Sequence, residues 1–174
     1  MLSPIKLAPA GILLASLMLS APAAHGQAAT AGPFGALAGS WTGGGNMSFS
    51  DGRQESLRCR AVYQPSGAGD NLRLNLKCAS AGGNFDLASD VAYRGGAISG
   101  SWSEASRNAN GTLTGRASGN TIEASARGEN FAANLALTTQ GNRQSVSIRS
   151  QGGDIAGVTL ALSRSEGRTV GLSR

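Results

Sequence analysis

The chain has 174 residues and a formal net charge of +5 at pH 7, and 40% of its residues are hydrophobic, 5% aromatic and 14% charged. This length fits one domain with a modest core. Because the positive excess is mild and no block of like charges stands out, the composition argues against a nucleic-acid-binding tail.

The first 26 residues are typical of a secretory signal peptide. Lys6 is the only charge before the apolar run AGILLASLMLSA, and small residues precede a cleavage site after Gly26. The run is too short to form a permanent membrane-spanning helix. We therefore expect a periplasmic or secreted protein with a flexible lead-in at 27–36, one β-barrel domain at 37–164 and a flexible tail at 165–174.

Removal of the signal peptide would also remove His25, the one histidine of the chain. A mature chain without histidine cannot build a Ser-His-Asp centre, a His-ligated zinc site or a His-ligated haem. The two cysteines, Cys59 and Cys78, are expected to form a disulfide in an oxidising compartment. We therefore expect no enzymatic activity, no metal site and no cofactor.

Short turns containing glycine recur along the chain and predict β-hairpins. Across one of them Leu72 would lie opposite Tyr93, and across another Ala126 would lie opposite Phe131. The registers that these turns fix place apolar residues on one face of each strand. The turns are Gly82-Gly83, Gly95-Gly96, Gly119-Asn120, Gly128-Glu129 and Gly141-Asn142.

Two longer loops complete the pattern upstream. A loop centred on SGAGD sets Cys59 directly opposite Cys78, a geometry that allows a cross-strand disulfide. A three-residue loop within SDGRQ sets Trp41 opposite Tyr63, whereas a strict two-residue turn would place apolar side chains on the wrong face.

The sequence thus predicts an all-β protein of about ten antiparallel strands in an up-and-down meander, with no helix after the signal peptide. A transmembrane barrel would be apolar outside and polar within, but here the outward positions are polar, which predicts a soluble barrel. The predicted inward face carries Trp41, Met47, Leu57, Tyr63, Leu72, Leu74, Leu76, Phe85, Leu87, Val91, Ile98, Trp102, Leu113, Ile122, Phe131, Leu135, Leu137, Val146, Ile148, Val158, Leu160 and Leu162.

Closure of the meander into a barrel would remove both exposed sheet edges. The last strand, ending at Arg164, would then lie beside the start of the strand that contains Trp41. The inward position of Arg164 would let its guanidinium stack on the indole and close the barrel floor.

The combination of Gly39-Ser40-Trp41 at the first strand with Arg164 at the last resembles the calycin superfamily, which includes lipocalins, fatty-acid-binding proteins, nitrobindin-like barrels and small periplasmic protease inhibitors. Ten strands resemble the fatty-acid-binding and nitrobindin branches more than the eight-stranded ones. The resemblance implies a calycin-like barrel over 37–164. The chain departs from those branches in having no helical lid after the first strand and no histidine for a nitrobindin-like haem.

The interior of the predicted barrel is lined by many small residues at mid-height. Either a cavity is left for an apolar ligand, or the walls approach and the barrel flattens into a packed sandwich. These positions are Gly43, Gly45, Ala61, Gly100, Gly115, Ala117, Ala124, Ala126 and Ala133.

Four inward residues are candidates to contact a ligand in the lumen: Tyr63, Tyr93, Trp102 and Glu104. The tyrosine hydroxyls could instead bond to backbone, and Glu104 could be a solvated carboxylate at the rim. Trp41 is interpreted as a structural plug.

A second candidate surface is basic and lies on the outside of one hairpin. Arg58, Arg60, Arg73 and Lys77 share that face, and Arg60 lies directly opposite Lys77, a repulsion that an anionic partner would relieve. The alternative is a solvated charge ladder, because Asp86 and Asp90 are expected diagonally across from Lys77.

Two functions follow from these features. The first is an exported, non-catalytic barrel that binds a small apolar or amphipathic ligand in its lumen. The alternative is a periplasmic protein-binding, inhibitor or envelope-structural barrel that acts through its loops or the basic outer face. Neither involves specific nucleic-acid binding or a membrane span.

Overall fold

The computed structural model describes residues 32–165. The predicted signal peptide at 1–26, the start of the predicted lead-in and nearly all of the predicted tail lie outside the described residues. No helix within 32–165 is both long enough and apolar enough to cross a membrane.

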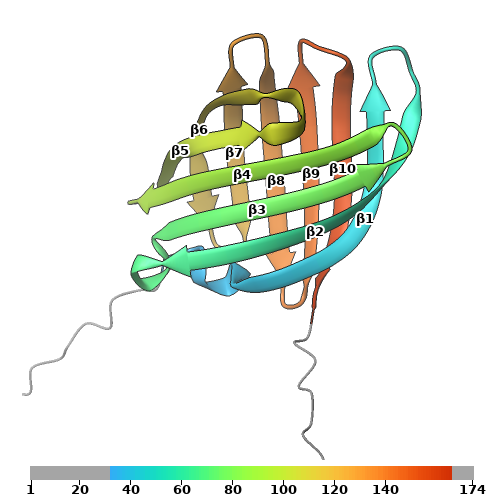
Figure 1. The fold of residues 1–174 in the computed structure, drawn as a ribbon. Coiled ribbons are helices and arrows are strands. Elements are labelled where there is room, and N and C mark those ends of the chain that lie inside the picture. The colour runs from blue at the N-terminus through green and yellow to red at the C-terminus, as the bar shows by residue number, and fades with distance from the viewer. Residues whose placement is uncertain (1–31, 166–174) are drawn as a thin grey trace, which may run out of the picture.

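Ten strands follow one another along the chain, each antiparallel to the next, and β1 also pairs with β10 to close the barrel (Figure 1). The predicted all-β meander and its closure are confirmed. The strands are β1 (Gly39–Phe49), β2 (Gln54–Ser66), β3 (Asn71–Ser80), β4 (Gly83–Arg94), β5 (Ala97–Glu104), β6 (Ala109–Ser118), β7 (Thr121–Gly128), β8 (Ala132–Gln140), β9 (Arg143–Gln151) and β10 (Ile155–Arg164), and three short 3-10 helices are η1 (Gly35–Leu37), η2 (Gly67–Gly69) and η3 (Ala105–Arg107).

The barrel wall has two halves that cross. In Figure 1, β2, β3 and β4 run across the view in front of β7–β10, which run steeply behind them. Between the halves, β1 lies against both β2 and β10. Its Gly45 approaches β10 so closely that an added Cβ would overlap the Thr159 carbonyl, so only glycine fits at this part of the wall.

Several predicted hairpins are confirmed with their register. Tyr93 lies opposite Ile98, and Leu137 lies opposite Val146, as the turns Gly95-Gly96 and Gly141-Asn142 predict. The turn at Gly119-Asn120 is also present, since Ser118 pairs with Thr121. The strands on both sides of η2 pair Cys59 with Cys78, and these residues form the predicted disulfide.

The predicted register of the β3–β4 hairpin is wrong by two residues. Leu72 lies opposite Val91 rather than Tyr93, because the turn is Ala81-Gly82 instead of Gly82-Gly83. The amide of Gly82 donates to the Ser80 hydroxyl at 3.2 Å and to the Glu55 carboxylate at 3.0 Å. These two acceptors, one of them on β2, fix the turn one residue earlier than the glycine pair alone predicts.

The predicted register of β7 and β8 is also wrong by two residues, but here the turn lies one residue later than predicted. Ala126 lies opposite Ala133 rather than Phe131. The amide of Gly128 donates to the Phe131 carbonyl at 2.8 Å, which places the turn at Glu129-Asn130.

The β1–β2 loop has the predicted three residues but begins one residue earlier, at Ser50. Trp41 therefore lies opposite Ala61 rather than Tyr63. Gly52, with φ of +87°, takes the left-handed conformation that the third position of such a loop requires. All three shifts are by two residues, so every side chain keeps its predicted face.

The core includes Phe34, which the sequence pattern places in the lead-in, and Leu37, at the predicted start of the barrel domain. Phe34 is 1% exposed and Leu37 2% exposed, and both belong to the buried cluster. The amides of Gly32 and Phe34 donate to the carbonyls of Ala68 and Gly69 next to η2. This part of the predicted lead-in is thus folded against the barrel, in a position that strand periodicity does not reveal.

Candidate functional site

The end of the barrel at the start of β1 is closed by an aromatic plug. Trp41 is 0% exposed, and its indole N–H donates to the Leu37 carbonyl at 2.8 Å. The guanidinium of Arg164 lies 4.4 Å from the centre of the Trp41 ring system and donates to the carbonyls of Ala36 and Ala38. We call this closed end the floor; it consists of Phe34, Leu37, Trp41 and Arg164.

A buried polar chain lies beside the floor. The Tyr63 hydroxyl donates to Gln144 Oε1 at 2.7 Å, and Gln144 Nε2 donates to the Thr139 hydroxyl at 3.2 Å. Burial raises the pKa of the Tyr63 phenol above its usual range, so the group stays neutral and keeps donating. Tyr63, a predicted ligand contact, therefore has its hydroxyl engaged within the protein.

Gln144 and Thr139 are buried polar residues that the sequence reasoning did not single out. Gln144 occurs two positions before Val146 and Thr139 two positions after Leu137, so both lie on predicted inward faces. A polar residue at an inward position is the signal that could have identified them.

At the opposite end, which we call the mouth, Trp102 is held by its neighbours on the wall. Its indole N–H donates to the Thr112 carbonyl at 3.2 Å, and its ring meets the Phe131 ring edge-on with centroids 5.6 Å apart. Only 9% of Trp102 is exposed, so a small part of its surface is available to a ligand.

Glu104, also at the mouth, is 8% exposed and has a structural task. Its carboxylate accepts the backbone N–H groups of Asp86 at 2.8 Å, Ser106 at 3.2 Å and Arg107 at 2.8 Å. It thereby caps η3 and ties that turn to β4. The carboxylate is consequently engaged rather than free to receive a polar head group.

Tyr93 is the remaining predicted lumen contact, and its polar group, unlike those of the other three, is not engaged by the protein. It is half-buried, and its ring meets Phe34 edge-on with centroids 6.5 Å apart. Within the described part of the chain its hydroxyl has no hydrogen-bond partner. The structure does not bring the four predicted residues into one cluster: Tyr63 and Tyr93 lie toward the floor, whereas Trp102 and Glu104 lie toward the mouth.

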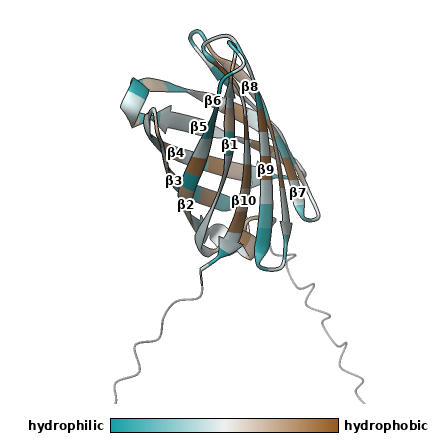
Figure 2. Cartoon of the chain, turned by 90° about the vertical axis from the view of Figure 1, so that its right-hand side faces the viewer, coloured by the Kyte–Doolittle hydropathy of each residue, from teal (hydrophilic) through white to brown (hydrophobic). Residues whose placement is uncertain are grey.

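Between floor and mouth the inner wall is aliphatic and incompletely packed. Brown, hydrophobic segments recur along the strands in Figure 2. Side chains on the inward face here stay partly exposed, although a fully packed core would cover them. They include Leu74, Leu76, Val91, Leu113, Ile122, Leu135, Ile148 and Val158.

Small residues explain why the inner wall is uncovered. Val91 faces Gly100 across β4 and β5, and Leu135 faces Ala124 across β7 and β8. Each large side chain thus has a neighbour that fills little of the interior. Among residues 32–165 no group of three or more His, Cys, Asp or Glu side chains could hold a metal ion.

The basic outer face is partly neutralised. Lys77 Nζ lies 2.6 Å from Asp86 Oδ2, and Arg73 Nε lies 2.9 Å from Asp90 Oδ1. The expectation that both aspartates lie diagonally to Lys77 is wrong, because the register shift of β3 and β4 sets each one directly opposite its cation.

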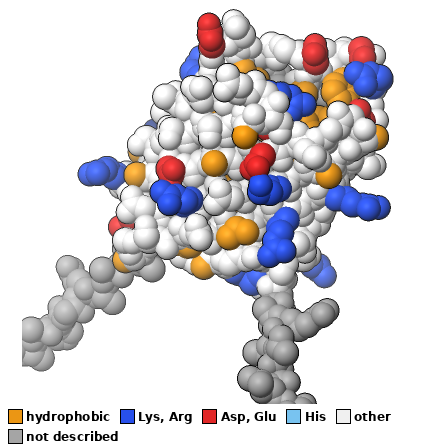
Figure 3. Space-filling view, in the orientation of Figure 1, with side chains coloured by type: hydrophobic (Ala, Val, Ile, Leu, Met, Phe, Trp, Pro, Cys, Tyr) orange, Lys and Arg blue, Asp and Glu red, His pale blue; other side chains and the backbone are white. Residues whose placement is uncertain are grey.

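Two other cations of this face keep their charge uncompensated. Arg60 lies opposite Lys77 as predicted, and within the described residues neither Arg58 nor Arg60 forms an ion pair. In Figure 3, blue and red side chains are interspersed over the visible face and the orange patches are small and separate.

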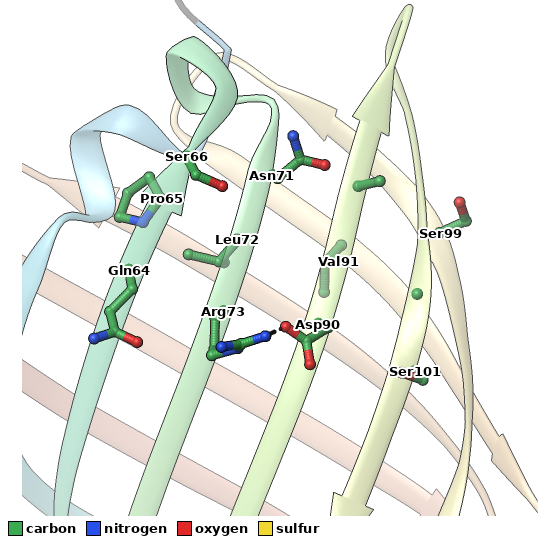
Figure 4. A pocket seen from close by; sticks show the side chains of 12 residues that line it. Gln64, Pro65, Ser66, Asn71, Leu72, Arg73, Asp90, Val91, Ser99 and Ser101 are labelled. Carbon is green, nitrogen blue, oxygen red and sulfur yellow. Dashed lines mark hydrogen bonds and ion pairs between the residues drawn. The ribbon is translucent and has the colours of Figure 1, made fainter.

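Two open hollows lie on the outside of the wall, and the sequence reasoning did not predict them. One, of about 570 Å³, spans β2–β5 and contains the Arg73–Asp90 pair with Gln64, Asn71 and Ser101 around it (Figure 4). The other, of about 500 Å³, spans β6–β9 and includes the side chains of two arginines and Glu123. Small outward residues such as Ala92 and Ser99 line the first hollow. The sequence signal that could have revealed the hollow is the alternation of small and large residues at the outward positions of these strands.

Comparison with known proteins links the chain to others through its fold. No family model matches it, and no curated protein matches it by sequence. Rv2717c from M. tuberculosis has a TM-score of 0.63 and 16% identity, with 76% of this chain and 94% of that chain covered. The S-type phycobiliprotein lyase CPES from Guillardia theta has a TM-score of 0.54 and 13% identity, with coverage of 78% and 92%. What the chain shares with these structures is the fold, which here is a closed barrel of ten antiparallel strands.

At these identities the likeness concerns the backbone alone. In this barrel the floor is sealed by Trp41 and Arg164, and the wall above is an aliphatic surface that the protein covers only in part. Such an arrangement can hold an apolar molecule by desolvation.

Proposed function

We propose that the protein binds a small apolar or amphipathic molecule in the lumen of its barrel and catalyses no reaction. The observation that carries the proposal is the set of inward aliphatic side chains that stay partly exposed above a sealed floor. Apolar surface exposed to water is unfavourable by about 25 cal/mol per Å², so a ligand that covers it gains this free energy.

Among the described residues, the engagement of several potential acid–base groups supports a binding role. Cys59 and Cys78 form a disulfide, Tyr63 donates to Gln144, and Glu104 accepts three backbone amides. A general acid must lie within hydrogen-bond reach of the substrate and have a proton to donate, and a general base must have a free lone pair there to accept a proton. These groups are already engaged in holding the barrel together.

We also propose that the protein works in the periplasm or outside the cell. The signal-like first 26 residues and the disulfide support this location, because oxidising compartments preserve disulfides.

Native mass spectrometry of the protein purified from its source tests the lumen proposal. We expect added mass from a small molecule that is released on unfolding. Ala126, half-buried on the inward face of β7, offers a way to fill the lumen: Ala126→Leu should lower the bound fraction. Ala136→Leu, at an exposed outward position of β8, is the matched control and should keep it.

A protein-binding role is the second candidate, and the uncompensated Arg58 and Arg60 on the outer face favour it. The same measurement separates the two functions. Protein that carries no small molecule, together with unchanged behaviour of Ala126→Leu, would contradict the lumen proposal and leave the outer face as the functional surface.

A further inference from the structure

The charged side chains at inward positions narrow the kind of ligand that the lumen can accept, and this step rests on the proposed lumen function. Within residues 32–165, the inward faces of the strands carry three charged residues: Glu55, Glu104 and Arg164. All three lie at an end of the barrel rather than along the aliphatic wall.

The cation cannot serve as a partner for an anionic head group. Arg164 covers the Trp41 ring and donates to the carbonyls of Ala36 and Ala38 and to the Asn142 side chain. Its guanidinium is thus turned to the floor and held there by acceptors. A carboxylate or phosphate along the aliphatic wall would find no other cation on the inward faces, because the guanidiniums of Arg53 and Arg107 lie at the mouth, over the Phe49 and Phe85 rings.

The two carboxylates are equally unavailable to a cationic head group. Glu104 accepts three backbone amides at the mouth. Glu55 accepts the Gly82 amide at 3.0 Å and lies 3.7 Å from Arg53. Each carboxylate already has its compensating partners, so neither would offset the desolvation of a buried ammonium.

The polar groups that remain inside are few and neutral. The Ser89 hydroxyl donates to the Ser101 carbonyl at 2.8 Å, and Tyr63 belongs to the chain beside the floor. Within the described part of the chain two inward hydroxyls have no hydrogen-bond partner, that of Tyr93 toward the floor and that of Ser150 toward the mouth. Burial of an ion without a partner of opposite charge is strongly unfavourable, whereas a single neutral polar group needs one hydrogen bond.

We infer that the lumen selects an electrically neutral, largely aliphatic molecule with at most one hydrogen-bonding group at each end, and excludes fatty-acid-like anions and aliphatic cations. The exclusion comes from the aliphatic wall, which offers a buried ion no counter-charge. A neutral molecule of the same length loses only the hydration of its polar group, which one hydrogen bond can replace.

Matched aliphatic probes test this inference on the full-length mature protein. Dodecanol, dodecanoate and dodecylammonium share one chain and differ in head-group charge, and each would displace a neutral fluorescent probe at neutral pH below micelle formation. We expect dodecanol to bind at least about tenfold more tightly than either ion. Dodecanoate or dodecylammonium binding as tightly as dodecanol would overturn the inference but leave lumen binding intact. No binding of any probe, with no added mass on the native protein, would overturn the proposed function and this inference with it.

Acidification provides a second measurement on the unaltered protein. As the pH falls toward the ordinary pKa of a carboxylic acid, dodecanoate becomes neutral, so its affinity should rise while that of dodecanol stays constant. Equal pH dependence of the two would contradict selection by charge.

A cation introduced into the lumen should reverse the preference. Ala126→Lys, on the inward face, is expected to bind dodecanoate more tightly than the unaltered protein does, and Ala136→Lys, on the outward face, is the control that should not. A gain in the control as large as in Ala126→Lys would assign dodecanoate binding to the outer surface and overturn the inference. If Ala126→Lys does not fold, the acidification series decides.

Discussion

Trp41 and Arg164 act together as one structural unit at the floor. Trp41 is fully buried and hydrogen-bonded to Leu37, so Trp41→Ala should lower the free energy of unfolding by about 3 to 5 kcal/mol. Arg164→Ala should weaken the same region by about 1 to 2 kcal/mol, through loss of the cation–π contact and the bonds to two carbonyls. Denaturant unfolding checks both values; variants that unfold like the parent would contradict closure of the barrel at this point.

Tyr63 makes the stability of the protein sensitive to alkali. Its folded-state pKa is raised by burial, so the folded protein keeps the phenol protonated at a pH where the unfolded chain releases the proton. The stabilisation is complete below the unfolded pKa of about 10 and is lost as pH rises beyond it.

The chain has two tyrosines, so Tyr93→Phe leaves Tyr63 as the sole phenol. In that variant phenolate absorbance should appear together with loss of the folded state, not before it. Phenolate formation in protein that is still folded would contradict the engaged hydroxyl.

At the scale of elements, the alternation of apolar and polar residues predicted the face of each side chain correctly, whereas the glycine-containing turns predicted the strand registers less well. Alternation of apolar and polar residues assigned Leu72, Ala126 and Trp41 to the inward face, and the structure confirms those faces despite registers that differ by two. The exact turn depends on contacts from outside the hairpin, such as that of Glu55 on β2 with the turn between β3 and β4. Local sequence contains no sign of such a contact.

The close approach of β1 and β10 gives a sharp prediction about Gly45. In Gly45→Ala the new Cβ would overlap the Thr159 carbonyl, which is backbone and cannot move as freely as a side chain. We therefore expect the free energy of unfolding to fall by about 1 to 3 kcal/mol. Gly35→Ala is the matched control, since a Cβ there meets nothing within 4 Å. Thermal unfolding of both variants provides the measurement, and equal stability would mean that β1 and β10 are farther apart than described.

At the scale of the whole molecule, the candidate site was harder to predict than the fold. The sequence placed Tyr63 and Glu104 on the inward face, but the partners that engage them come from β9 and β4. The alternation of apolar and polar residues does not predict contacts between strands that are distant in sequence. It also does not predict which backbone amides donate to a side chain at a strand end. The sequence left open whether the closed wall encloses a cavity or collapses, because that choice depends on which large and small inward residues lie opposite each other.

The disulfide links compartment to global stability. Cys59 and Cys78 are 19 residues apart in sequence, and a cross-link of that span restricts the unfolded chain by about 3 kcal/mol. The free energy of unfolding of the double variant Cys59→Ala, Cys78→Ala should be lower by about that amount, and its denaturant midpoint should be correspondingly lower. Thiol titration of the folded protein from its natural compartment should find no free thiol, and two reactive thiols would contradict the proposed export.

The last prediction concerns chemistry: the purified protein should turn over no ester, glycoside or phosphate substrate. The described residues contain no histidine, their two cysteines are joined, and the buried carboxylate of Glu104 is held by three amides, so the free inward hydroxyl of Tyr93 has no acid–base partner beside it. A substrate panel measures this directly, with Glu104→Gln as the decisive variant. Glutamine has the same shape but a neutral side chain and one acceptor oxygen fewer. Turnover that is present in the parent and absent in a Glu104→Gln variant that unfolds like the parent would identify the carboxylate as a participant and turn the aliphatic lumen into a substrate pocket. Turnover that persists unchanged in Glu104→Gln would instead point to a contaminating enzyme or to a group outside the lumen.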